Sequence, residues 1–476
     1  MAREGREGEG ADDGEPGSHE ADDATEAWLV VRWAITMRRV RCRPFTIVVA
    51  CATVACGQAS PGGSTSGQDS GVEASAPGGG DAGGPLDAAA TDSGGAEADA
   101  GAPFVAAAHR SFPSLAKNTG RVLAPLTLVT IVASNDSLSA ELFAFGDALA
   151  SSAWWHEVGA PYALGAATSV HATGPAITTN PSPADMTAYI QSLIDGATVP
   201  APDGETCYLL YLPDGVSIAS GPGPFSAYHS PYPAYGEGLG DGWVVVSRST
   251  PYGGGETQLE ELTRVASHEV LEAATDPGWT SYAVAPAATP PWKGSVWSVF
   301  QVPGPVEGGD LCEGTRTFEP AGGSEYQRIL APSPPADGDP CLPAHAEPYY
   351  DVSAPGDWYA LGADAGAVSI PITGWSAAVT DEWLVIATVT QASAGFASLE
   401  GTLLEVASPL AGVGMCLGAG MNNGVTASLG LSAPAGATSG DYAVVLVESF
   451  RVDPATCFPA LAGDQFHMWL VGVYVP

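Results

Sequence analysis

One segment of the sequence places potential metal ligands at helical spacing. In ASHEVLEAATDP (266–277), His268 and Glu272 are four residues apart and Glu269 follows the histidine. On a helix, such positions lie on one face about 6 Å apart. In zinc peptidases of the His-Glu-x-x-His type, two histidines at this spacing bind the metal and the glutamate acts as general base. Here a carboxylate replaces the second histidine. The alternative is a solvent-exposed helix face on which His268 and Glu272 form an ion pair.

Other residues are candidates to complete such a site. A zinc site needs at least three protein ligands, and we expect the third to come from a separate downstream element. Glu307 or Asp310 would supply it, from a segment that leads to Cys312. Asp276 is a rival ligand, although its position is more typical of a helix-end turn. His229 is a further candidate, as a ligand or as a donor to an oxyanion, with a packed histidine as the alternative.

The expected ligand set is one imidazole and two carboxylates, which is harder and more anionic than a site with two histidines. We expect one divalent metal, Zn²⁺ first, with Mn²⁺, Fe²⁺ or Ca²⁺ as alternatives. In an active enzyme Glu269 would take a proton from water and pass it to the leaving amine. The added negative charge weakens the power of a metal to acidify water, which argues for slow hydrolysis.

A capped helix is expected to carry the motif. Thr257 and Glu260 have the spacing of a capping box, in which each side chain accepts from the other residue's backbone N–H. Pro277 cannot continue a helix, and Gly278 can turn the chain. The sequence therefore predicts a helix that presents His268 and its neighbours to the rest of the domain.

Buried strands precede this helix. The β-branched or apolar runs LTLVTIVAS (126–134), TCYLLYLP (206–213) and WVVVS (243–247) predict strands, and two segments of helical periodicity lie between the first and the second. The order strand, helix, helix, strand, strand, helix predicts an α+β domain with a central sheet over about residues 104–346.

Alternating apolar residues recur in the C-terminal part, residues 347–476. VSIPIT places Ile370 and Ile372 on one face of a strand, and TASLGL does the same with Leu429. Several such short strands between turn residues predict an all-β sandwich. PAGATSGDYAVVLV resembles a hairpin of bacterial immunoglobulin-like domains, with Tyr442 placed like a corner tyrosine. We expect attachment, binding of glycan or protein, or a purely structural role.

The first hundred residues predict export. We take Met37 as the start, with residues 1–36 a mis-assigned start or a disordered segment. Residues 37–56 combine basic residues with a short apolar run, as signal peptides do, and TVAC ending at Cys56 resembles a bacterial lipobox. Residues 57–103 are rich in Gly, Ala and Asp and predict a disordered linker. We expect an outer-membrane or cell-surface lipoprotein, held by its lipid anchor only, or otherwise a secreted protein.

Charge and cysteines restrict the partners and the compartment. With 16 Lys and Arg against 53 Asp and Glu, the net charge is −37, which excludes nucleic acid as a partner. In an exported protein we expect two disulfides, Cys312–Cys341 and Cys416–Cys457. Cys207, in an apolar run, is then expected to be a buried free thiol.

The motif and three further segments resemble the EXORDIUM, or phosphate-induced protein, family and its bacterial relatives. SHEVLEAATDP, followed by EGGDLCEG (307–314), is similar to the family's helix and its downstream stretch. SSAWWHEVGAPYALGAAT (151–168) and FSAYHSPY (225–232) are similar to segments that precede that helix. The resemblance covers about residues 120–345 and implies a secreted or wall-associated protein. The motif itself implies a zincin-like domain.

Two functions of different class follow. The first is a metal-dependent hydrolase, metallopeptidase-like, that acts on extracellular or envelope protein and uses Glu269. The second is a non-catalytic extracellular binding protein in which the same cluster holds a structural ion or no metal. A further alternative treats both domains as modules that bind cell-wall material.

Overall fold

A computed structural model describes residues 103–219, 227–232, 241–248, 257–285, 288–300, 306–313, 316–318, 323–362, 367–408, 410, 418–451 and 467–476. The expected signal peptide, the linker and the Cys416–Cys457 pair lie outside these residues. Residues from Phe104 to Pro476 belong to one compact unit. Among the helices of the described residues, none combines the length and apolar character needed to cross a membrane.

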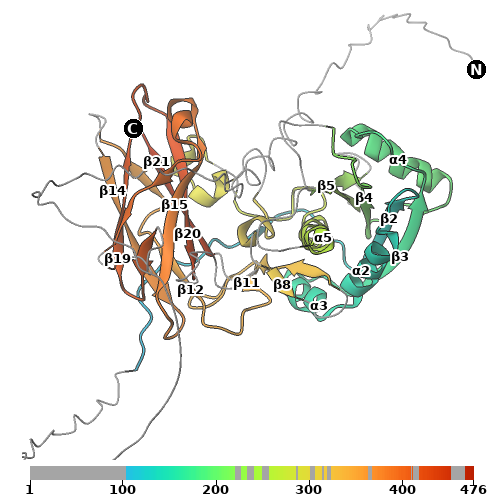
Figure 1. The fold of residues 1–476 in the computed structure, drawn as a ribbon, viewed down its shortest axis with the longest axis horizontal. Helices are drawn as coiled ribbons and strands as arrows, with labels where there is room; N and C mark the ends of the chain where they lie inside the picture. Colours follow the sequence, from blue (N-terminus) through green and yellow to red (C-terminus); the bar gives the residue numbers. More distant parts are fainter. Residues whose placement is uncertain are drawn as a thin grey trace, which may run out of the picture. The chain divides into compact units, whose positions relative to one another are not determined.

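A five-stranded sheet forms the centre of the N-terminal part (Figure 1). Its strands, in spatial order, are β3 (Ala167–Gly174), β2 (Leu126–Ala133), β4 (Thr206–Tyr211), β6 (Asp241–Val246) and β5 (Ala227–Tyr232). All neighbours run parallel except β5, which is antiparallel to β6 at the edge of the sheet. The expected central sheet is confirmed, and it contains two strands, β3 and β5, that the sequence patterns did not reveal.

Helices cover both faces of this sheet. Along β2, Leu128 and Val132 face one hydrophobic cluster while Val129 and Ile131 face another, as the alternation of a strand requires. Helix α4 (Pro183–Asp195) packs on the second face through apolar side chains at helical spacing. The first face is covered by α2 (Ser139–Ser151), α3 (Ala153–Gly159) and α5 (Gln258–Thr275). Figure 1 shows α4 and α5 on opposite sides of the strands.

Helix α5 is buried around its whole circumference. The predicted capping box is confirmed, since Thr257 Oγ1 accepts from Glu260 N at 3.2 Å and Glu260 Oε2 accepts from Thr257 N at 2.6 Å. Every residue from Glu261 to Thr275 is buried. The interpretation of the motif as a solvent-exposed helix face is therefore wrong.

A short strand packs against α5. Strand β9 (Glu325–Gln327) lies along the helix, and its backbone N–H groups donate to the hydroxyls of Thr263 and Ser267, both at 2.9 Å. The N-terminal part also contains further short elements. They are β1 (Ala116–Lys117), β7 (Tyr282–Ala283), β8 (Arg316–Phe318), β10 (Ile329–Leu330), β11 (Cys341–Leu342) and the 3-10 turns Ala160–Tyr162, Pro291–Lys293, Val296–Val299 and Asp310–Cys312.

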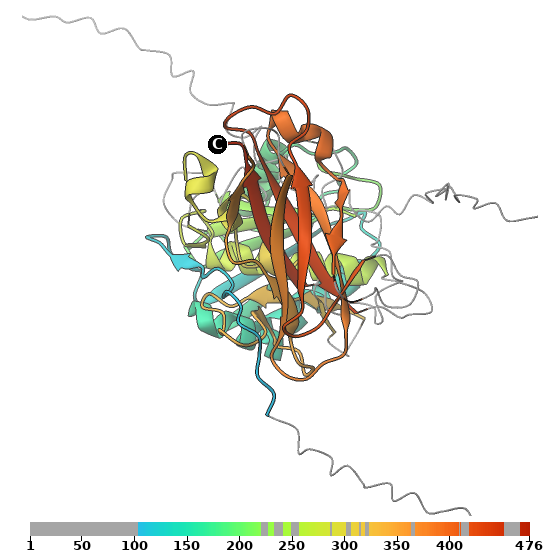
Figure 2. The ribbon, with the colours of Figure 1, turned by 90° about the vertical axis from the view of Figure 1, so that its left-hand side faces the viewer.

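The C-terminal part is built of two sheets, as predicted. One contains β12 (Tyr350–Ser353), β14 (Ala367–Ser376), β19 (Thr426–Ser432) and β17 (Val406–Ala407). The other contains β13 (Trp358–Ala360), β21 (His467–Tyr474), β20 (Tyr442–Phe450), β15 (Trp383–Ala392), β16 (Leu403–Leu404) and β18 (Ala419–Met421), and the 3-10 turn Ala394–Leu399 follows β15. Ile370, Ile372 and Leu429 are buried, which confirms the alternation that predicted these strands. Figure 2 views this part with its long strands toward the reader.

Candidate metal centre

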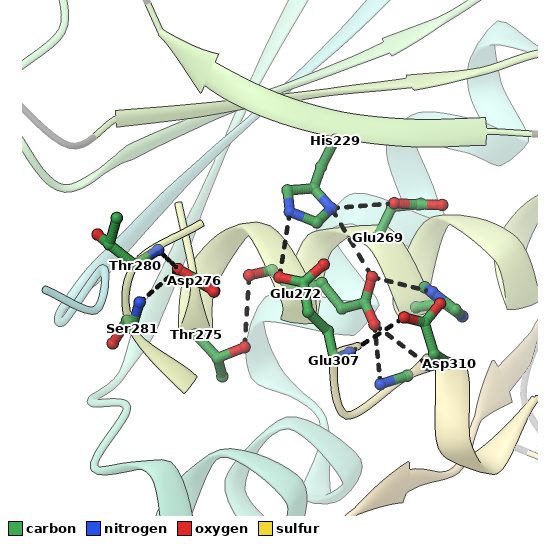
Figure 3. Close-up of polar contacts among 11 residues, drawn as sticks. His229, Glu269, Glu272, Thr275, Asp276, Thr280, Ser281, Glu307 and Asp310 are labelled. Atoms are coloured by element: carbon green, nitrogen blue, oxygen red, sulfur yellow. Dashed lines mark hydrogen bonds and ion pairs between the residues drawn. The ribbon is translucent and has the colours of Figure 1, made fainter. Parts of the chain in front are cut away.

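The register of β5 places His229 over the motif helix. Ala227, two residues earlier, lies in the same hydrophobic cluster as α5, whereas Tyr228 and Tyr232 pack in the cluster on the opposite face. Because side chains alternate along a strand, His229 faces α5. Figure 3 shows its ring pointing toward Glu269 and Glu272. His229 Nδ1 lies 3.2 Å from Glu269 Oε2 and 3.7 Å from Glu272 Oε2.

A loop, residues 306–313, approaches the same face of α5. Glu272 Oε1 accepts from the backbone N–H of Gly309 at 2.9 Å and of Asp310 at 3.2 Å. A Cβ at position 309 would lie 2.8 Å from Glu272 Oε1 and 2.9 Å from His268 Nε2, which is closer than real Cβ atoms come to such neighbours. Glycine is therefore required here for the close approach of the loop to the helix.

Three contacts fix the course of this loop. Gln327 Nε2 donates to Gly309 O at 2.8 Å, so the strand that packs along α5 also holds the loop. Leu330 N donates to Gly308 O at 3.0 Å. The predicted disulfide Cys312–Cys341 is confirmed, with a Cα–Cα distance of 6.0 Å. Cys207 is free and buried, also as predicted.

The helix, the edge strand and the loop bring all six predicted site residues together. His268 Nε2 lies 3.0 Å from Glu272 Oε2. Two sets of potential ligand atoms each lie within 4.8 Å of one another, namely His268, Glu272 and Asp310, and His229, Glu269 and Glu272. Glu307 belongs to neither set, and its Oε1 lies 3.5 Å from His229 Nε2. The geometry thus places Asp310 beside the motif histidine and Glu307 beside His229.

Asp276 and the pair His156–Glu157 belong to neither ligand set. Asp276 caps the end of α5, where its Oδ1 accepts from the backbone of Thr280 at 2.6 Å and of Ser281 at 2.7 Å (Figure 3), so its role as a turn residue is confirmed. Another His-Glu pair of the sequence, His156 and Glu157, is exposed on α3.

Buried negative charge controls protonation at the centre. Burial lowers the pKa of His229, but Glu307 and Glu269 outweigh it and raise that pKa well above 6.5. For His268, burial is likewise outweighed, chiefly by Glu272, and the pKa is raised well above 6.5. Burial raises the pKa of Glu307 to about 8 against the opposing effect of His229. The cluster therefore attracts positive charge strongly, whether as protons or as a cation.

The donor atoms fit a divalent cation. Imidazole and carboxylate are ligands that Zn²⁺ and Mn²⁺ accept, and here all of them are buried. Glu269 Oε1 is buried and has no hydrogen-bond partner within the described part of the chain. Two contributors escaped the sequence analysis, Gly309 and Gln327. The Gly-Gly pair between Glu307 and Asp310 was the available signal, because adjacent glycines between acidic residues indicate a close backbone approach.

In comparisons with models of protein families and with curated proteins, the chain matches none of them. The resemblance to the EXORDIUM family consequently stays an expectation that depends on the four segments quoted above.

Proposed function

We propose that this chain is a metal-dependent hydrolase of metallopeptidase type, with a zincin-like domain, that cleaves peptide bonds in extracellular or envelope protein. The observation that carries the proposal is the convergence of His268, Glu272 and Asp310 from a buried helix and a disulfide-held loop. Three such protein ligands are typical of a catalytic zinc site.

We assign the metal position first to these three residues. Zn²⁺ is the first choice, with Mn²⁺, Fe²⁺ or Ca²⁺ as alternatives. A cation held there supplies a Lewis acid that polarises a carbonyl group and lowers the pKa of water. Asp310 is preferred to Glu307 as third ligand because it shares a ligand set with His268.

Glu269 is the residue proposed for proton transfer. Its Oε2 is held by His229 Nδ1 at 3.2 Å, which leaves Oε1 to take a proton from water and give it to the leaving amine. Glu307 lies against the other ring nitrogen of His229 and so orients the ring. His229 and Glu307 therefore act as positioning residues in this reaction.

A second function is favoured by one specific observation. The residues His268, Glu269 and Glu272 are at most 3% exposed, and the other three site residues at most 6%. Such burial is typical of a structural ion, and it favours a non-catalytic extracellular binding protein. In that protein the four carboxylates and two imidazoles of the centre would only stabilise the fold.

We also propose that the chain is exported as a lipoprotein or secreted, and that residues 347–476 form an immunoglobulin-like module for attachment or binding. The disulfide Cys312–Cys341 supports export, because such bonds persist in oxidising compartments. The two sheets of the C-terminal part support the module.

The decisive experiment combines metal analysis with cleavage of a peptide library by the purified full chain. Glu269→Gln should retain the metal held by His268, Glu272 and Asp310, and it should lose cleavage by at least about 100-fold, because a positioned acid–base group contributes about that much. The matched control is Glu157→Gln in the exposed pair His156–Glu157, which should leave cleavage unchanged. Cleavage that survives Glu269→Gln would refute the proposed mechanism. Bound metal without cleavage by the unmodified chain would favour the structural ion.

A further inference from the structure

The two histidines of the centre are too far apart to bind one ion. Glu272 Oε2 lies 3.0 Å from His268 Nε2 and 3.7 Å from His229 Nδ1, so it is close to both rings. Yet no ligand set formed by the described residues contains both histidines, so these two nitrogens are more than 4.8 Å apart. Ligand bonds of about 2.0–2.2 Å allow at most about 4.4 Å between two atoms on the same ion. The two imidazole rings therefore face two different cation positions.

We infer that the centre binds two divalent cations that share the carboxylate of Glu272. His268 and Asp310 complete one position, and His229 and Glu269 complete the other. The inference builds on the proposed function because it concerns the same cluster, but it adds a second ion and makes His229 a ligand. Pairs of metal ions about 3.5–4 Å apart are an established arrangement in hydrolases, including aminopeptidases.

The charge of the cluster supports two ions. Four carboxylates, those of Glu269, Glu272, Glu307 and Asp310, lie in the centre, each at most 4% exposed. Buried charges are costly unless they are paired or bind metal. With both imidazoles neutral, as metal ligation requires, two divalent cations offset these carboxylates more fully than one does, and the nearby carboxyl groups of Asp276 and Glu313 add to the demand for positive charge.

Neighbouring contacts would orient each ligand. Glu272 Oε1 is held by two backbone N–H groups of the loop, which leaves Oε2 directed between the two rings. Asp310 Oδ2 accepts from Glu307 N at 3.0 Å, which fixes its carboxylate. Glu307 Oε1 faces His229 Nε2 at 3.5 Å, so that Nδ1 is the nitrogen directed at the second position. Carboxylates and backbone groups commonly hold metal ligands in this way. Glu269 would bind through Oε2 and keep Oε1, the atom assigned to proton transfer.

The test measures stoichiometry rather than activity. The full chain is depleted with chelator, dialysed against Mn²⁺ and analysed by plasma mass spectrometry, and we expect two ions per chain. His229→Ala and His268→Ala should each retain one ion, and Glu272→Ala should lose both. His171→Ala is the matched control, because that histidine pairs with Asp147 at 2.9 Å outside the centre and should leave two ions bound. One ion per chain, unchanged by His229→Ala, would overturn the inference.

A second measurement needs no variant. Two Mn²⁺ ions that share a carboxylate give an exchange-coupled electron paramagnetic resonance signal, whereas a single ion gives the spectrum of isolated Mn²⁺. A spectrum of isolated Mn²⁺ alone at saturation would also overturn the inference. The outcomes separate it from the proposed function, since two coupled ions without peptide cleavage refute only the hydrolase. Cleavage with one bound ion refutes only the second position.

Discussion

Replacement of Gly309 by alanine tests whether the approach of the loop to α5 builds the metal centre. The added Cβ would lie 2.8 Å from Glu272 Oε1 and 2.9 Å from His268 Nε2, so the loop must move away from the helix. That movement breaks the 2.9 Å hydrogen bond from Gly309 N to Glu272. A hydrogen bond to a charged group contributes about 2 kcal/mol. At about 1.4 kcal/mol per factor of ten, we expect metal binding to weaken about 30-fold.

The assay is a competition titration of the metal-depleted chain against a chromogenic chelator. Gly430→Ala is the matched control, because a Cβ there, on a strand of the sandwich, has no heavy atom within 4 Å. Circular dichroism of both variants establishes that the fold is retained. If Gly309→Ala binds metal within twofold of the control, the loop does not shape the ligand set, and the close approach has another purpose.

Two further predictions concern stability. Burial raises the pKa of Asp351 to about 7 from its ordinary 3.8, against the effect of its hydrogen bonds. The folded state therefore binds this proton more tightly than the unfolded chain, and stability falls as pH rises from about 4 to about 7, by about 4 kcal/mol at 1.36 kcal/mol per pH unit. Asp351→Asn should remove that loss in denaturant titrations at pH 4 and 7; an unchanged pH dependence would contradict it. The disulfide closes a loop of 29 residues, so the double variant Cys312→Ser, Cys341→Ser should lose about 3–4 kcal/mol, measured by thermal unfolding, and bind metal more weakly. Full metal affinity in this variant would show that the bond does not hold the loop.

The motif helix could be predicted from sequence because its signals are local. The capping box of Thr257 and Glu260 and the proline after Asp276 are read from neighbouring residues, and the i,i+4 spacing fixes His268 against Glu272. The loop near Cys312 was also predicted to join them, since a disulfide restrains where it can lie. Capping and i,i+4 spacing depend only on neighbouring residues, so the sequence alone predicts them.

The choice between Glu307 and Asp310 could not be made in advance. Both follow His268 by about forty residues, and their directions depend on the path of a loop that Gly309, Gln327 and the turn at Asp310–Cys312 determine. Such contacts come from distant parts of the chain. A pattern of residue types does not encode them.

Physical reasons explain why the sequence patterns did not predict strands β3 and β5. β3 is an edge strand with several half-buried or exposed residues, so it lacks the apolar pattern of its neighbours. β5 contains Pro231, which cannot donate to a ladder and argues against a central strand. At the edge of a sheet that proline is tolerated. Because β5 was not predicted, the position of its residue His229 over α5 could not be predicted either.

The location of His229 on an edge strand has a consequence for local motion. In the described part of the sheet, β5 pairs with β6 alone, so its other side receives no support from a neighbouring strand. An ion bound by both His229 and Glu272 would link β5 to helix α5 and so restrain the strand. Loading with metal should then slow the amide hydrogen exchange of Tyr228 and Ser230 more than that of the central strand β4, where neighbours on both sides already hold the backbone.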